Sequence, residues 1–237
     1  MTAPNPTPGT REAAARVVAR ALFDTGCVQA RHDEPFRLPS GWASPVYMDC
    51  RKLISYPRIR RELVAQCLAL LKERGVTGLE SVAGAETSGI ALAAWLAEAL
   101  DLPMQYVRKK PRGFGPATQV EGVIKPGSRV LLVDDVMAGG QSQVSFCRAL
   151  AAAGAPVKDA FVIFDYAAFP TAELLAPLGV TVHALVNWRD MLALGRESGA
   201  LPPAALAELE EFLRDPVRWS RAHGGIPQAS SAGAAAP

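Results

Sequence analysis

The 237-residue chain has few cysteines, no marked excess of charge of either sign and no long apolar run. Its cysteines, Cys27, Cys50, Cys67 and Cys147, form no C-x-x-C pair and no cluster with histidine, which argues against a zinc site or a disulfide framework. We therefore expect reduced cysteines in a cytoplasmic protein. The net charge of +2 argues against a nucleic-acid partner. No apolar stretch reaches the ~18 residues of a membrane helix, and the N-terminus lacks a secretory pattern, so no membrane partner is expected.

Several nucleotide-binding motifs are also missing. Gly84 and Gly89 have the spacing of a P-loop, but Ile90-Ala91 follow where that loop needs Lys and Ser or Thr. This argues against an ATPase or GTPase. No G-x-G-x-x-G follows a predicted strand, which argues against a dinucleotide-binding fold. The three histidines lie far apart in the chain, and we expect them to have structural roles.

The apolar pattern predicts alternating strands and helices. Predicted strands cover residues 81–83, 104–107, 130–133, 157–164 and 180–186, and predicted helices cover 10–22, 59–71, 89–100, 141–153, 171–175 and 206–213. Residues 36–57 are expected to form an irregular hairpin, with 46–48 extended, and residues 108–124 a long loop. Apolar strands that alternate with helices predict an α/β fold with a mostly parallel central sheet and helices on both faces. Residues 1–9 and 223–237 are expected to be a disordered lead-in and tail.

The stretch most informative about chemistry is VLLVDDVMAGGQS, residues 130–142. Asp134 and Asp135 follow four apolar residues, and Gly139-Gly140 precede a predicted helix. Ligands of open α/β sheets bind at the carboxyl ends of strands, and a glycine loop before a helix offers backbone N–H groups to a phosphate. Two carboxylates would repel that anion, so we expect them to hold sugar hydroxyls, magnesium or a developing cation. A phosphorylated ribose brings these groups together. The alternative is a polar strand end before a turn, which the flanking pattern disfavours.

Four blocks, in this order, resemble the orotate phosphoribosyltransferase family of type I phosphoribosyltransferases. They are FRLPSGWASPVYMDCRKL from Phe36, SVAGAETSGIALA from Ser81, YVRKKPRGFGPATQVEG from Tyr106, and residues 130–142. In that family they correspond to the N-terminal segment, the pyrophosphate loop, the mobile loop and the motif that binds 5-phosphoribosyl 1-pyrophosphate (PRPP). The resemblance spans about residues 20–190 and four ordered blocks, so it is more specific than the PRPP motif alone.

The resemblance implies an activity and an organisation. The expected reaction joins orotate and PRPP, with Mg²⁺, to give orotidine 5′-monophosphate and pyrophosphate. It further implies a homodimer with shared active sites. The expected parts are an N-terminal helix and hood over residues 10–56, a phosphoribosyltransferase core over 57–190 and a C-terminal helical segment over 191–222.

The resemblance also implies roles for particular residues. Asp134, Asp135, Lys109 and Arg112 would be catalytic, with the aspartates stabilising positive charge on the ribose. Arg108 would bind substrate together with Lys109 and Arg112, in a loop that closes over the site. Magnesium would be held mainly by PRPP, not by protein ligands. Further substrate-binding candidates are Val133, Val136, Met137, Ala138, Gly139, Gly140, Gln141 and Ser142 at the PRPP motif, Thr87 and Ser88 at the pyrophosphate loop, and Tyr47, Ser40 and Gly41 near the base.

Each of these segments also has a purely structural interpretation, and some positions depart from the family pattern. Residues 108–124 could be a solvated charged loop, residues 84–89 a plain turn, and Tyr47 a packing residue. Pro39 and Ser88 stand where the family often has Lys, Phe114 replaces a His, and Ala138 and Gln141 replace Thr. Asp165-Tyr166 stand where the family places an Arg that holds the orotate carboxylate. A transferase for another base and a non-catalytic PRPP-sensing regulator are therefore the competing hypotheses.

Overall fold

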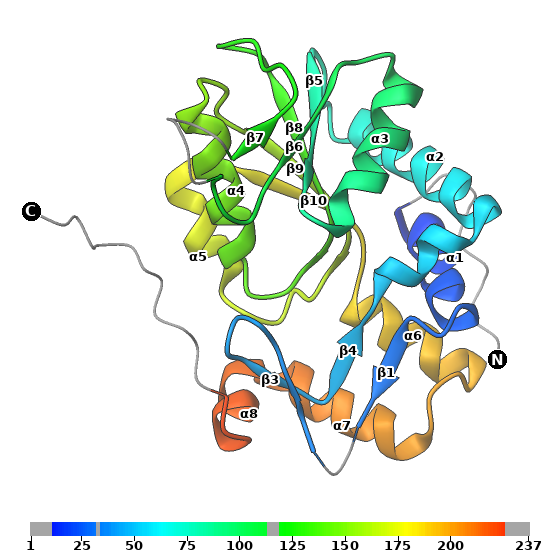
Figure 1. The fold of residues 1–237 in the computed structure, drawn as a ribbon. Coiled ribbons are helices and arrows are strands. Elements are labelled where there is room, and N and C mark those ends of the chain that lie inside the picture. Colours follow the sequence, from blue (N-terminus) through cyan, green and yellow to red (C-terminus); the bar gives the residue numbers. More distant parts are fainter. Residues whose placement is uncertain (1–10, 32–33, 113–118, 226–237) are drawn as a thin grey trace, which may run out of the picture.

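A computed structural model describes residues 11–31, 34–112 and 119–225. The expected lead-in, Thr10, Phe114 and most of the expected tail lie outside these residues. The centre of the molecule is a six-stranded sheet with the order β10-β9-β8-β5-β6-β7 (Figure 1). The strands are β5 (Ser81–Ala85), β6 (Met104–Val107), β7 (Val120–Glu121), β8 (Val130–Met137), β9 (Asp159–Asp165) and β10 (Thr181–Asn187). All neighbours are parallel except β6 and β7.

Helices cover both faces of this sheet, as the sequence predicts (Figure 1). On one face lie α1 (Arg11–Asp24), α2 (Pro57–Glu73) and α3 (Ser88–Leu100), and on the other α4 (Gln141–Ala152) and α5 (Thr171–Leu175), with the short η2 turn (Ala176–Leu178) after it. Because β8 is central and covered on both sides, its first five residues are buried. None of the helices that the structure describes is long and apolar enough to cross a membrane.

A smaller layer lies beyond the carboxyl ends of the sheet strands (Figure 1). Strand β1 (Val28–Ala30) pairs with β4 (Val46–Met48), and β2 (Phe36–Arg37) pairs with β3 (Ala43–Ser44); η1 (Cys50–Ser55) then leads into α2. The helices α6 (Trp188–Ser198), α7 (Pro203–Arg214) and α8 (Pro216–Ala222) complete this end of the molecule (Figure 1). Trp42 stacks on Phe169 at 4.8 Å between ring centroids, so the two layers share an aromatic core. We use "hood" below for residues 28–55; the expected domain boundaries remain a prediction.

Two sequence predictions about elements were wrong, and one helix begins earlier than expected. Strand β8 continues past Val133 to Met137, because β9 pairs with it as far as Met137↔Asp165. The loop expected over 108–124 contains β7, which pairs antiparallel with β6. Helix α6 begins at Trp188, before the start at residue 191 expected for the C-terminal helical segment. Asn187 and Asp190 form a capping box at this start: Asn187 Oδ1 accepts from the Asp190 N–H at 3.2 Å, and Asp190 Oδ2 accepts from the Asn187 N–H at 3.0 Å.

Candidate active site

A pocket of about 490 Å³ lies between the carboxyl ends of the sheet strands and the hood. Its walls come from the hood, from the turn between β5 and α3, from the segment that follows β6 and from the segment joining β8 to α4. Most of the predicted site residues line it: Ser40, Tyr47, Ser88, Lys109, Asp134, Asp135, Val136, Ala138, Gly139, Gly140, Gln141 and Ser142. The structure therefore brings the hood block and the three core blocks together around one cavity.

The other predicted site residues lie outside this lining. Val133 and Met137 are buried in the sheet, Thr87 precedes α3, and Gly41 forms the turn between β2 and β3. Arg108 and Arg112, which follow β6, form ion pairs with Glu121 of β7 at 3.5 Å and 3.3 Å. Their assignment to substrate stays a prediction.

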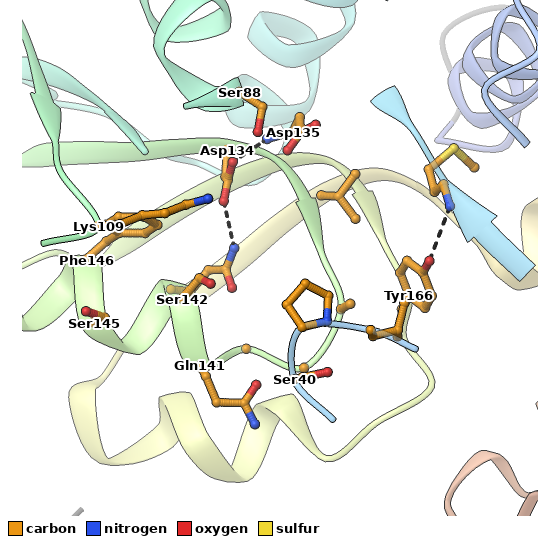
Figure 2. Close-up of a pocket in the computed structure, with 18 of the residues that line it drawn as sticks. Ser40, Ser88, Lys109, Asp134, Asp135, Gln141, Ser142, Ser145, Phe146 and Tyr166 are labelled. Atoms are coloured by element: carbon orange, nitrogen blue, oxygen red, sulfur yellow. Dashed lines mark hydrogen bonds between the residues drawn. The ribbon is translucent and has the colours of Figure 1, made fainter. Parts of the chain in front are cut away.

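The paired aspartates have different surroundings. Asp134 is 8% exposed, and both of its oxygens accept hydrogen bonds, from the Asp135 N–H at 2.9 Å and from Gln143 Nε2 at 3.0 Å. Burial, reinforced by the Asp135 carboxylate, raises the pKa of Asp134 well above its usual value of 3.8. Asp135 is only half-buried, beside Ser88 (Figure 2). Asp135 therefore has the more accessible carboxylate of the two, and Asp134 holds the backbone of Asp135.

The start of α4 supplies unpaired backbone donors. Gly140 is the N-cap residue with φ of +81°, and no side chain caps the helix. The N–H groups of the first turn therefore point out of the helix without a side-chain partner, together with the positive end of the helix dipole. Gly139 brings this segment against the hood, because a Cβ on Gly139 would lie 2.8 Å from Ser40 Oγ. An anion such as a phosphate suits this end of the pocket.

Lys109 reaches the pocket from the opposite side to the hood. Its ammonium is directed toward Asp134 (Figure 2), and its positive charge moderates the rise in the pKa of Asp134. Its backbone N–H donates to Glu86 Oε2 at 2.7 Å, so the turn after β5 holds the backbone that follows β6. In the first turn of α3, Gly89 is required for packing, since a Cβ there would overlap the carbonyl oxygen of Val133. Glu86 and Ser88 line the cavity, whereas Gly84 and Gly89 do not.

Sequence reasoning missed five polar lining residues. Gln143 lies in the first turn of α4, and its amide fixes Asp134. Ser145 lies further along the same helix. Glu86 holds the Lys109 backbone, Arg51 reaches the cavity from η1, and Tyr166 follows β9. The only signal for the first four was their position within or beside the motif blocks, and Tyr166 lies far from all four blocks.

Tyr166 connects the core to the hood. Its side chain is 1% exposed, and its hydroxyl accepts the Met48 N–H at 3.2 Å and donates to the Val46 carbonyl at 3.5 Å (Figure 2). Burial raises the pKa of Tyr166 far above its usual value, so the hydroxyl keeps its proton. The position of the hood over the strand ends therefore depends on a residue at the end of β9.

Fold and site together define a phosphoribosyltransferase. The family model of the phosphoribosyl transferase domain matches residues 62–168, which include the paired aspartates and the start of α4. Among solved structures, the orotate phosphoribosyltransferase of Aeropyrum pernix has a TM-score of 0.64 and 30% identity, covering 77% of this chain and 99% of that one. The UMP synthase of Leishmania donovani has a TM-score of 0.74 and 28% identity; the match covers 86% of this chain and 43% of that longer one.

Relatives that match nearly the whole chain define the family more narrowly. The orotate phosphoribosyltransferase of Cereibacter sphaeroides is 49% identical over 214 residues, which are 90% of this chain and 92% of that protein. That of Rhizobium meliloti is 45% identical with the same coverage. The chain belongs to the orotate phosphoribosyltransferase family.

Proposed function

We propose that this chain transfers the phosphoribosyl group of PRPP to orotate, giving orotidine 5′-monophosphate and pyrophosphate in the formation of UMP. The observation that carries this proposal is the convergence, on one cavity, of an uncapped helix start, a half-buried aspartate and a lysine. These three groups match the three parts of PRPP: the 5′-phosphate, the ribose and the pyrophosphate. The family relationship supports orotate as the base.

The proposed reaction exchanges two bonds at the anomeric carbon of the ribose. The bond to the pyrophosphate oxygen breaks, a bond to a ring nitrogen of the base forms, and the proton of that nitrogen passes to the departing pyrophosphate. Positive charge develops on the ribose as the leaving group departs. Asp135, held in place by the Asp134–Gln143 pair, would face that charge, and electrostatic stabilisation of this kind is a large part of many enzymatic rate enhancements. Lys109 would face the departing anion.

We propose Mg²⁺ as the cofactor. Among the described residues no group of three or more His, Cys, Asp or Glu side chains could hold a metal by itself. Mg²⁺ is commonly bound by one or two carboxylates together with phosphate oxygens and water. The carboxylates of Asp135 and Glu86 on the pocket wall fit that role, with PRPP supplying the remaining oxygens. When bound, the ion neutralises charge on the pyrophosphate.

We also propose a homodimer in the cytoplasm. Arg108 and Arg112 follow β6 but are not in the lining of their own chain's pocket, as expected if they serve a neighbouring subunit's site. The four cysteines are buried and unpaired, as expected in a reducing compartment. Sedimentation tests the dimer, and recovery of activity on mixing two inactive variants, one in Arg112 and one in Asp135, tests the shared site.

The test of the proposed activity is an absorbance assay of orotate consumption with PRPP, with and without Mg²⁺. The same assay is run with uracil and hypoxanthine in place of orotate. We expect Mg²⁺-dependent turnover of orotate and little of the other two bases. Turnover of uracil or hypoxanthine without orotate would identify a different transferase, and binding of PRPP without turnover of any base would identify a regulator.

A further inference from the structure

The cavity contains two cationic side chains among its described lining, and they lie on different walls. Lys109 comes from the segment after β6 and faces Asp134, whereas Arg51 comes from η1 in the hood. The ranges outside the described residues, 1–10, 32–33, 113–118 and 226–237, contain no Lys or Arg. Arg51 is therefore the cation on the hood side of this chain's pocket.

The Arg51 side chain is oriented by two hydrogen bonds. Its Nε–H donates to Asp49 Oδ1 at 2.6 Å, and its NH2 group donates to the Tyr47 hydroxyl at 3.2 Å. A guanidinium has five N–H groups, so the remaining three have no partner among the residues that the structure describes. They include N–H groups on both terminal nitrogens, the pair that grips a carboxylate in a bidentate manner.

The ion pair with Asp49 leaves the terminal N–H groups of Arg51 accessible to a ligand. The Asp49 contact uses Nε, and the Arg51 side chain remains 58% exposed on the cavity side of η1. Exposed ion pairs of this type contribute little by themselves, so a second carboxylate can share the guanidinium. Tyr47, which lines the same wall, offers a ring face for a planar base next to the open guanidinium edge.

The end of β9 offers no alternative cation. Asp165 Oδ1 accepts the Ala167 N–H at 2.9 Å, and the Tyr166 hydroxyl is occupied by the backbone of β4. This is the position where the family pattern leads one to expect a carboxylate-binding arginine. With Lys109 assigned to the departing pyrophosphate, Arg51 in the hood is the other described cation of this lining and can supply the counter-charge of an anionic base.

We propose that Arg51 recognises the carboxylate of the base and makes the enzyme selective for a carboxylated pyrimidine. This inference rests on the proposed function, of which it names the selectivity residue. A neutral pyrimidine would leave the open guanidinium edge without a partner, whereas a carboxylate would form charge-assisted hydrogen bonds to it. Arg51 acts on the affinity and choice of the base, not on PRPP.

The experiment compares Arg51→Gln and Arg51→Lys with the wild type and with Arg58→Ala, an exposed arginine on α2 outside the pocket. KM is measured for orotate at saturating PRPP and for PRPP at saturating orotate, and uracil is measured as a competitor of orotate. We expect Arg51→Gln to raise KM for orotate at least about tenfold, which corresponds to about 1.4 kcal/mol. KM for PRPP and inhibition by uracil should change less than about twofold, and Arg51→Lys should fall between.

The outcomes separate this inference from the proposed function. A rise in KM for PRPP in place of orotate would assign Arg51 to pyrophosphate and overturn the inference. An unchanged KM for orotate, or an equal loss in orotate and uracil affinity, would overturn it as well while leaving the transferase activity established. Absence of orotate turnover by the wild type would sink the proposed function itself. Unchanged melting temperatures in all three variants control for folding.

Discussion

Replacing Asp134 with Asn should stabilise the protein while it impairs catalysis. The substitution keeps the shape of the side chain. Its carbonyl oxygen can still accept the Asp135 N–H, and the Gln143 amide can rotate so that its own oxygen accepts from the introduced NH2 group. What disappears is a buried negative charge next to a second carboxylate, and that charge is the reason why the pKa of Asp134 is raised.

The sign and size of the effect follow from linkage between protonation and folding. A carboxyl group whose pKa is higher in the folded than in the unfolded protein favours the fold at pH values below its unfolded pKa, near 3.8 for Asp134. This contribution is lost as pH rises from there through the folded pKa. At neutral pH the Asp134 carboxyl therefore lowers the free energy of unfolding of the wild type. The loss is about 1.4 kcal/mol for each tenfold by which folding decreases the acid dissociation constant of Asp134. For a chain of this size, 1.4 kcal/mol corresponds to roughly 3–6 °C in melting temperature.

The assay is thermal unfolding of the wild type, Asp134→Asn and the exposed control Glu62→Gln between pH 4 and pH 8. We expect Asp134→Asn to melt higher at pH 7–8, with the difference shrinking toward pH 4, and Glu62→Gln to follow the wild type. A melting temperature that is equal or lower at neutral pH, or a difference independent of pH, would refute the reasoning about the buried charge.

Three further substitutions test other parts of the account. Tyr166→Phe leaves the Met48 N–H buried without an acceptor, so it should lower the free energy of unfolding by about 1–3 kcal/mol in denaturant titrations. An unchanged midpoint would show that this hydrogen bond does not stabilise the position of the hood. Asp135→Asn should lower kcat/KM at least ~10-fold, about 1.4 kcal/mol of transition-state stabilisation, and an unchanged value would remove Asp135 from the mechanism. Lys109→Ala should slow turnover without altering the circular dichroism spectrum, and wild-type rates would contradict its role at the leaving group.

The core of the fold was predictable because its signals are local. The apolar stretches that became β5, β6 and β8–β10 alternate with helical patterns, and Gly139-Gly140 mark the start of α4. Strand β7 could not be found this way, since its two residues show no period of their own and are defined by pairing with Tyr106 and Val107. The end of β8 was missed because pairing with β9, and not apolar character, extends it past the aspartates.

The candidate site likewise has a part that the sequence predicts and a part that it does not. Asp134, Asp135 and the glycines stand in one contiguous motif, and the cavity contains them. The different surroundings of the two aspartates were not predictable, because they arise from the burial of Asp134 and its bond to Gln143. Arg51 and Tyr166 acquire their roles through contacts between the hood and the strand ends, which no sequence spacing reports.

The central claim is that a phosphorylated ribose binds at the end of β8 with its phosphate on the first turn of α4. The most direct test is calorimetric titration of PRPP, with Mg²⁺, into the wild type, Ser142→Glu and Ser142→Gln. Ser142 is the second residue of α4 and is exposed, so a glutamate there favours the helix dipole while it places negative charge where the phosphate should lie. The account predicts that Ser142→Glu abolishes PRPP binding without lowering the melting temperature and that Ser142→Gln largely retains binding. Wild-type affinity in Ser142→Glu would contradict it.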